Sequence, residues 1–181
     1  MTRRKIIKTL KRGGVGVLPT DTIYGIVGSA LKIKTVERIY RLRKRNRKKP
    51  MIILVSSITD LKRFGANVDS KTKKTLKRFW PGKVSIILLC PSKKFTYLHR
   101  GMRTLAFRVP AKKSLRALLR KTGPLVAPSA NPGDKPPSKT IRDAKKYFGK
   151  KVDFYLDGGR RVGKPSKLIA IAGDESVVLR E

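Results

Sequence analysis

The sequence predicts an α/β domain built on a mixed, twisted sheet. Short apolar runs typical of buried strands alternate with segments whose apolar residues recur at helical spacing. The 181 residues, 39% of them hydrophobic, suffice for one domain with one core. No apolar run approaches the roughly 20 residues that cross a bilayer, and the N-terminus lacks the apolar stretch of a signal peptide. We therefore expect a single cytoplasmic domain.

The elements follow from the spacing of apolar residues and from the residues that flank them. Ile6, Ile7 and Leu10 share one face of a predicted helix, which Gly13 and Gly14 end. The predicted helices span residues 3–11, 35–44, 70–79, 113–121 and 140–147. The predicted strands run through Val15 and Val17 and over residues 51–55, 84–89, 105–109, 125–127, 154–156, 168–171 and 177–179.

Residues 14–28 join a short apolar strand to a turn that is rich in glycine and in polar side chains. A rigid edge of this kind is typical of a corner that binds a ligand. A cap at the start of a helix is the simpler alternative, because capping residues cluster in the same way. The polar side chains at this edge are Thr20, Asp21, Thr22 and Tyr24.

The charge is strongly positive, with 46 Lys and Arg against 11 Asp and Glu, a net charge of +35. Such a surface attracts polyanions, and the natural ones in a cytoplasm are RNA, DNA and nucleotides. The basic residues are densest at 41–49 and 71–78, where solvated helix faces are the alternative explanation. Few aromatic residues lie among them, which disfavours a platform for stacking single-stranded bases.

Several chemistries are disfavoured by the residues present. Cys90 is the only cysteine, so the chain has no internal disulfide and no cysteine zinc site, and its apolar surroundings predict burial. His99 is the only histidine, and we expect it in a loop without a metal or catalytic role. Residues 158–164 imitate a P-loop, but Pro165 follows where that motif needs Ser or Thr. No pair of carboxylates suggests acid/base hydrolysis.

Cations and small polar residues remain as the candidate chemistry. Arg43, Arg45 and Lys49 precede a predicted strand, alternation along 105–109 places Arg108 on one strand face, and the loop at 127–133 follows another strand. Together these residues predict an anion pocket. Positioned cations and hydrogen-bond donors stabilise phosphate charge, with Mg²⁺ carried by the nucleotide, so the pattern favours nucleotidyl transfer.

The chain resembles the YrdC-like threonylcarbamoyl-AMP synthases over nearly its whole length, in their short, stand-alone form. The landmarks, in order, are PTDTIYG at 19–25, the basic segment at 43–45, WPG at 80–82, RVP at 108–110 and SAN at 129–131. The resemblance implies the YrdC/RibB-like fold, in which a twisted mixed sheet with flanking helices surrounds a basic cavity. It also implies that ATP, L-threonine and bicarbonate become threonylcarbamoyl-AMP and pyrophosphate, for threonylcarbamoyladenosine in tRNA.

The resemblance also assigns roles to residues by position. It implies a catalytic role for Arg43 and Arg45. At position 43 the family has a lysine, so here a planar guanidinium replaces a compact ammonium group. The implied L-threonine contacts are Thr22, Arg108, Ser129 and Ser166. The implied ATP contacts are Arg45, Lys49, Thr104, Asn131, Thr140 and Arg180. Mg²⁺ would arrive with ATP and has no implied protein ligand, and a downstream threonylcarbamoyl-transferase would receive the product.

Two other functions remain open from the sequence. The first is a non-catalytic module that binds tRNA or other RNA in the same basic cavity, which predicts a steep salt dependence and no pyrophosphate release. The second is a related carbamoyl-transfer enzyme that keeps the nucleotide pocket and uses another acceptor.

Overall fold

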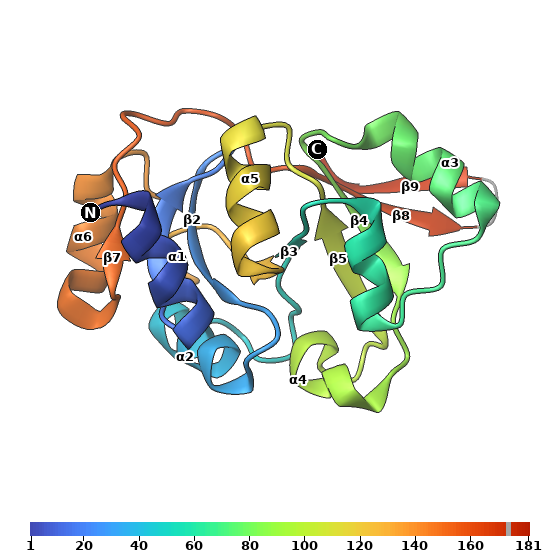
Figure 1. Ribbon diagram of the computed structural model, residues 1–181, viewed down its shortest axis with the longest axis horizontal. Coiled ribbons are helices and arrows are strands. Elements are labelled where there is room, and N and C mark those ends of the chain that lie inside the picture. The colour runs from blue at the N-terminus through green and yellow to red at the C-terminus, as the bar shows by residue number, and fades with distance from the viewer. Residues whose placement is uncertain (173–174) are drawn as a thin grey trace.

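A computed structural model describes residues 1–172 and 175–181 of the chain (Figure 1). The helices are α1 (Arg3–Arg12), α2 (Ile33–Arg43), α3 (Ser70–Phe79), α4 (Thr96–His99), α5 (Lys113–Thr122) and α6 (Ile141–Phe148). The strands are β1 (Gly16–Pro19), β2 (Tyr24–Ser29), β3 (Ile53–Leu54), β4 (Val84–Leu89), β5 (Thr104–Arg108), β6 (Leu125–Val126), β7 (Phe154–Tyr155), β8 (Lys167–Ala172) and β9 (Glu175–Arg180). Each helix and strand that the sequence predicts has a counterpart, while β2, α4 and a 3₁₀ segment at Ile58–Phe64 were not predicted.

The strands form a mixed sheet with the order β7-β1-β2-β6-β3-β5-β4-β8-β9 over the described residues. The pairs β1–β7, β3–β5 and β4–β8 are parallel, and the other neighbours are antiparallel. The sheet twists along its length, with helices packed against it (Figure 1). The predicted mixed α/β architecture is therefore confirmed.

Alternation along the central strands divides the core between the two faces of the sheet. Successive strand residues point to opposite faces, so Val17 and Ile53 belong to one hydrophobic cluster and their neighbours Leu18 and Leu54 belong to the other. Helices α1 and α5 cover the second face, as Figure 1 shows. Their contributions to that cluster are Ile6, Leu10, Leu115, Leu118 and Leu119.

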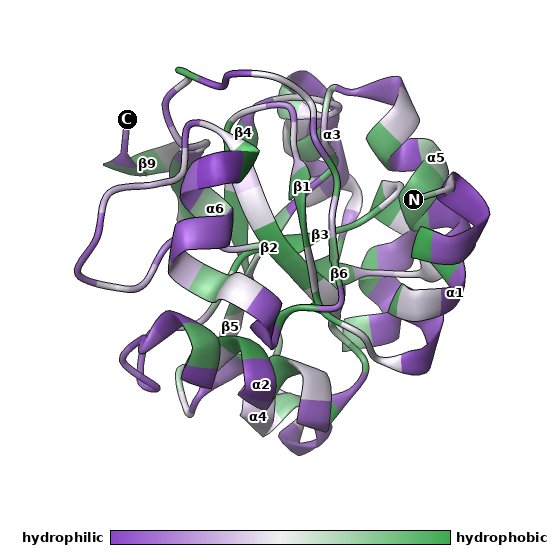
Figure 2. Cartoon of the chain, turned by 90° about the vertical axis from the view of Figure 1, so that its left-hand side faces the viewer, coloured by the Kyte–Doolittle hydropathy of each residue, from purple (hydrophilic) through white to green (hydrophobic). Residues whose placement is uncertain are grey.

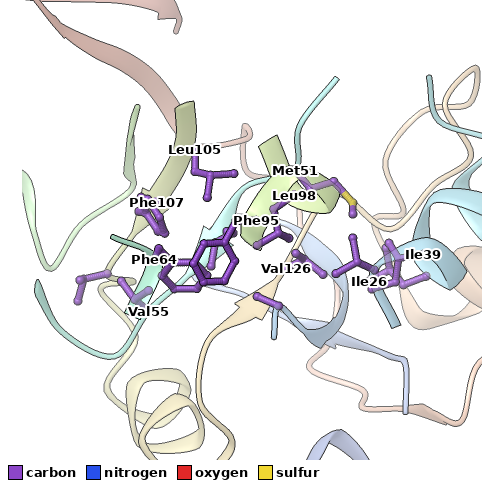
Figure 3. Close-up of a cluster of buried hydrophobic side chains, with 14 of the residues drawn as sticks. Ile26, Ile39, Met51, Val55, Phe64, Phe95, Leu98, Leu105, Phe107 and Val126 are labelled. Carbon is purple, nitrogen blue, oxygen red and sulfur yellow. The ribbon is translucent and has the colours of Figure 1, made fainter. Parts of the chain in front are cut away.

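The larger cluster lies on the first face and is shown in Figure 3. Its centre is aromatic: the ring of Phe64 lies 5.1 Å from that of Phe107 and 5.2 Å from that of Phe95, centroid to centroid. Tilted rings at these separations attract one another beyond the effect of burial. Ile39 from α2 and Leu98 from α4 extend the same cluster toward β2 and β6.

The structure confirms one residue environment and corrects another. Cys90 is fully buried, and burial raises the pKa of its thiol to about 12, as its apolar surroundings predicted. His99 was expected in a loop, but it ends α4 and is 3% exposed. Its Nδ1 accepts a hydrogen bond from the Gly101 amide at 3.2 Å, so this histidine helps to close the turn after α4. Within the described residues, no helix is long and apolar enough to cross a membrane.

Candidate active site

A cavity of about 270 Å³ lies against the sheet, and four arginine side chains converge on it. They come from separate places in the fold: Arg43 ends α2, Arg45 follows it, Arg108 ends β5 and Arg180 ends β9. Among the described residues, no Asp or Glu lines this cavity. The predicted site residues in its lining are Thr22, Arg43, Arg45, Thr104, Arg108, Ser129, Ser166 and Arg180.

Strand β5 shows how the sequence places polar groups in this cavity. Thr104 and Arg108 line it, whereas Leu105 and Phe107 between them are buried in the hydrophobic core. This is the period of two that a strand imposes on its side chains. The prediction that Arg108 lies on one strand face, away from the core residues, is confirmed.

Arg43 is held by the SAN segment. Its Nε donates to the carbonyl of Asn131 at 2.8 Å, and its Nη2 lies 3.1 Å from Ser129 Oγ and 3.4 Å from Asn131 Oδ1. The side chain is buried, and burial, followed by the nearby charge of Arg45, lowers its pKa to about 10. The planar guanidinium, with donors on separate nitrogens, suits these contacts better than the single ammonium group of a lysine. The substitution at position 43 therefore keeps a charge and adds fixed orientation.

Arg45 is fixed by the loop that follows it. Its Nε donates to the carbonyl of Lys49 at 3.2 Å and its Nη2 to the carbonyl of Pro50 at 3.1 Å. Tyr40 donates its hydroxyl to the same Lys49 carbonyl at 3.0 Å. Burial is the main cause that lowers the pKa of Arg45. These bonds fix the Arg45 guanidinium in the cavity lining, near that of Arg43.

Arg108 forms a buried ion pair with Asp21, which the sequence did not predict. Nη1 of Arg108 lies 3.0 Å from Oδ1 of Asp21, and each side chain is 4% exposed. Oδ2 of Asp21 accepts a hydrogen bond from the Ala111 amide at 2.8 Å, which fixes the carboxylate after β5. Neither Nε nor Nη1 of Arg108 has an aligned hydrogen-bond partner. The Arg108 side chain lines the cavity. Burial lowers its pKa, and the charge of Asp21 opposes that effect.

Strands β8 and β9 pair, and this brings Ser166, just before β8, next to Arg180 in the cavity lining. Arg180 donates from Nη2 to the Ser166 carbonyl at 2.7 Å and from Nε at 3.2 Å. The Ser166 hydroxyl lies 2.8 Å from that of Ser85, which is buried in β4. Sequence analysis missed Ser85. Its signal was a lone hydroxyl in the apolar run of residues 84–89.

The predicted ligand-binding corner contributes Thr20, Thr22 and Tyr24 to the cavity lining. Thr20 donates its hydroxyl to the Ile23 carbonyl at 2.6 Å, so the 3.0 Å contact between the two threonine hydroxyls has Thr22 as donor. The oxygen lone pairs of Thr22 stay available in the cavity lining. The Tyr24 hydroxyl donates to the Gly159 carbonyl at 2.8 Å, so its proton is already engaged within the protein.

Three predicted ATP contacts lie outside the cavity lining. Lys49 is exposed, and the Thr140 side chain caps α6 by accepting a hydrogen bond from the Asp143 amide at 3.2 Å. Asn131 is buried, and its amide donates to the carbonyls of Pro132 and Lys135 at 2.7 and 2.5 Å. In this structure Asn131 acts on Arg43 rather than on the cavity itself.

The family model Sua5_yciO_yrdC, described as "Telomere recombination", matches residues 8–181. The chain belongs to this family. A threonylcarbamoyl-AMP synthase from Bacillus subtilis is 33% identical over 174 residues, which are 94% of this chain and 50% of that protein. A relative from Methanocaldococcus jannaschii is 31% identical over 99% of this chain and 86% of its own length. P. abyssi Sua5 complexed with L-threonine matches with a TM-score of 0.89 at 29% identity, over 98% of this chain and 53% of that one.

The chain spans about half the length of the first two of its curated synthase relatives, 50% and 51%. The Sua5/YciO/YrdC domain therefore accounts for essentially all of the match. In this chain the domain presents guanidinium and hydroxyl groups to one cavity, a donor set that suits carboxylates and phosphates. Guanidinium groups do not ligate hard cations, which take oxygen ligands and favour carboxylates.

Proposed function

We propose that this chain is an L-threonylcarbamoyladenylate synthase, a nucleotidyltransferase that serves tRNA modification. The observation that carries the proposal is the convergence of four arginines on one cavity that no carboxylate of the described residues lines. Arg43 and Arg108 are buried and Asp21 pairs with Arg108, so the cavity keeps positive charge that an entering anion would neutralise. ATP together with the carboxylate of an amino acid supplies such anions. Family membership and the names of the relatives agree with this substrate set.

The L-threonine end would lie at Arg108. A guanidinium pairs with a carboxylate through its N–H donors, and the Arg108 side chain lines the cavity. Ser129, Ser166 and Thr22 line the same cavity and would bind the amine and hydroxyl of the amino acid. The lone pairs of Thr22 are suited to accept from the substrate amine.

The nucleotide end would lie at Arg45, Arg180 and Thr104, which line the same cavity. The charges of the two arginines would neutralise the triphosphate, a role that needs position more than covalent chemistry. Mg²⁺ would enter with ATP, held by phosphate oxygens and water. For Lys49, Asn131 and Thr140, contact with ATP remains a sequence-based proposal.

The proposed reaction has two steps. The threonine amine attacks the carbon of bicarbonate, water leaves, and a carbamate forms. A carbamate oxygen then attacks the α-phosphorus in line, the bond to the bridging oxygen breaks, and pyrophosphate leaves with that electron pair. Arg43 and Arg45 would stabilise the charge that grows on the phosphate oxygens. Holding the carbamate and the α-phosphate in contact supplies much of the rate.

Pyrophosphate release by the purified chain tests this proposal. ATP and bicarbonate are supplied with and without L-threonine, at moderate salt so that nonspecific binding of polyanions is suppressed. We expect release only when threonine is present. Absence of release while ATP still binds would overturn the proposal and favour a non-catalytic binding module. Release with another acceptor in place of threonine would favour a related carbamoyl-transfer enzyme.

A further inference from the structure

A second basic site lies outside the cavity, between α2 and α6. It is an open hollow of about 480 Å³ that shares no lining residue with the cavity. Figures 1 and 2 show α2 and α6 as neighbours on this side of the molecule. We call this hollow the α2–α6 groove. Its basic lining residues are Arg38, Arg41, Lys44, Lys135, Lys146 and Lys151.

Groups within the protein neutralise only part of this charge. Asp153 pairs with Arg38 at 2.6 Å, which accounts for one of the six cations. Helices α2 and α6 both end at the groove, and each C-terminus carries about half a negative elementary charge, so the two ends offset about one more. Even if Asp134, which precedes Lys135, is counted against the remainder, about three positive charges stay uncompensated.

Other carboxylates near these helices are already engaged. Glu37 of α2 pairs with Arg100 at 2.6 Å and with Arg47 at 3.3 Å, away from the groove lining. Asp143 of α6 accepts from the amides of Lys139 and Thr140 at 3.1 and 2.9 Å. The groove therefore presents excess positive charge that an external anion would neutralise.

The groove and the cavity share a wall. Leu42 and Lys44 line the groove, whereas Arg43 between them lines the cavity. The amide of Gly133 donates to the Arg43 carbonyl at 2.7 Å, which joins the end of α2 to the loop before α6. A ligand in the groove would thus lie directly behind the residues that hold Arg43.

We propose that the α2–α6 groove binds the phosphodiester backbone of RNA. Its cations sit on long side chains from α2, from the loop at Lys135, from α6 and from Lys151, so they are spread along an open surface. Helix C-termini present carbonyl groups, whereas a compact phosphate site uses amides at a helix N-terminus. Distributed cations without an amide cradle fit a chain of phosphates better than a single one. The choice of RNA over other polyanions rests on the proposed function in tRNA modification.

The test is the salt dependence of RNA binding in the absence of ATP and threonine. A fluorescein-labelled single-stranded RNA is titrated with the full chain between about 50 and 200 mM salt, and log K is plotted against log salt concentration. One variant carries Lys135→Ala, Lys146→Ala and Lys151→Ala. The matched control removes three charges from α3, at the opposite end of the molecule in Figure 1, through Lys73→Ala, Lys74→Ala and Lys77→Ala.

We expect the groove variant to reduce the slope by about 2, because each phosphate contact on a single strand contributes about 0.7. The α3 control should leave the slope unchanged, and both variants should keep threonine-dependent pyrophosphate release. Equal loss of slope in the two variants, or no loss in either, would overturn the proposal. Displacement of the RNA by poly-L-glutamate at equal charge concentration would overturn it too, in favour of an acidic protein partner. Pyrophosphate release is assayed separately, so failure of RNA binding is distinct from failure of the proposed reaction.

Discussion

Replacement of Arg108 by glutamine separates the stability of the fold from the recognition of threonine. Arg108→Gln leaves Asp21 as a buried carboxylate that has lost its partner, since both side chains are 4% exposed and 3.0 Å apart. Breaking a buried ion pair on one side costs about 3–5 kcal/mol. For a chain of this length each kcal/mol shifts Tm by about 2–4 °C, so we expect a fall of about 6 °C or more by differential scanning calorimetry.

The same substitution should also remove a charged hydrogen bond to the substrate carboxylate. Such bonds contribute about 1.5–3 kcal/mol, which corresponds to a loss of about 10- to 150-fold in kcat/KM for threonine. The double variant Asp21→Asn, Arg108→Gln removes both charges. It should recover most of the lost Tm, but kcat/KM for threonine should stay as low as in Arg108→Gln. Recovery of threonine use in the double variant, or an unchanged Tm in the single one, would refute the reasoning.

Three further predictions follow from the packing and the pKa shifts. Arg43→Ala removes the charge held by Ser129 and should lower kcat about 100-fold, while Arg43→Lys keeps the charge and should retain part of the activity in the same pyrophosphate assay. Gly28→Ala places a methyl group 2.4 Å from Cγ2 of Thr35, so we expect the free energy of unfolding in urea to fall by about 1–3 kcal/mol. Adding Thr35→Ser, which removes that Cγ2 methyl group, should recover the lost stability. A double variant as unstable as Gly28→Ala alone would contradict the packing. Burial raises the pKa of Cys90 from 9.0 to about 12, so the thiol of the unfolded chain ionises at a lower pH than that of the folded chain. The stability that this thiol contributes below pH 9 is therefore lost between pH 9 and 12, and Tm should fall over that range. Cys90→Ala should make the fall in Tm smaller, and an identical fall in both proteins would contradict the burial of the thiol.

The regular part of the fold was predictable because local rules determine it. Alternation along β5 placed Arg108 correctly, and helical spacing placed α1 and α3 within a residue of their ends. Strand β2 was missed because its glycines indicate a turn. In the structure Gly28 is a strand residue at which the side chain of Thr35 packs closely against the backbone.

The site was predictable only where a motif carried it. The cavity gathers most of the residues that the resemblance implied, yet the pair between Asp21 and Arg108 joins residues 87 positions apart, and no local pattern encodes it. The position of Lys49 depends on the conformation of the loop after α2, and Thr140 is a helix cap, as hydroxyls in that setting often are. His99 was misplaced because its burial comes from the tertiary contacts of α4.

The most direct test of the central proposal follows the bicarbonate carbon. The purified chain is incubated with ATP, L-threonine and carbon-13 bicarbonate. The nucleotide products are separated immediately and their masses are measured by mass spectrometry, before a labile adenylate hydrolyses. We predict an adenylate with the mass of threonylcarbamoyl-AMP that becomes one mass unit heavier with the labelled bicarbonate and is absent without threonine. An adenylate that carries threonine but no label, or ATP that binds and is recovered unchanged, would contradict the proposed synthase.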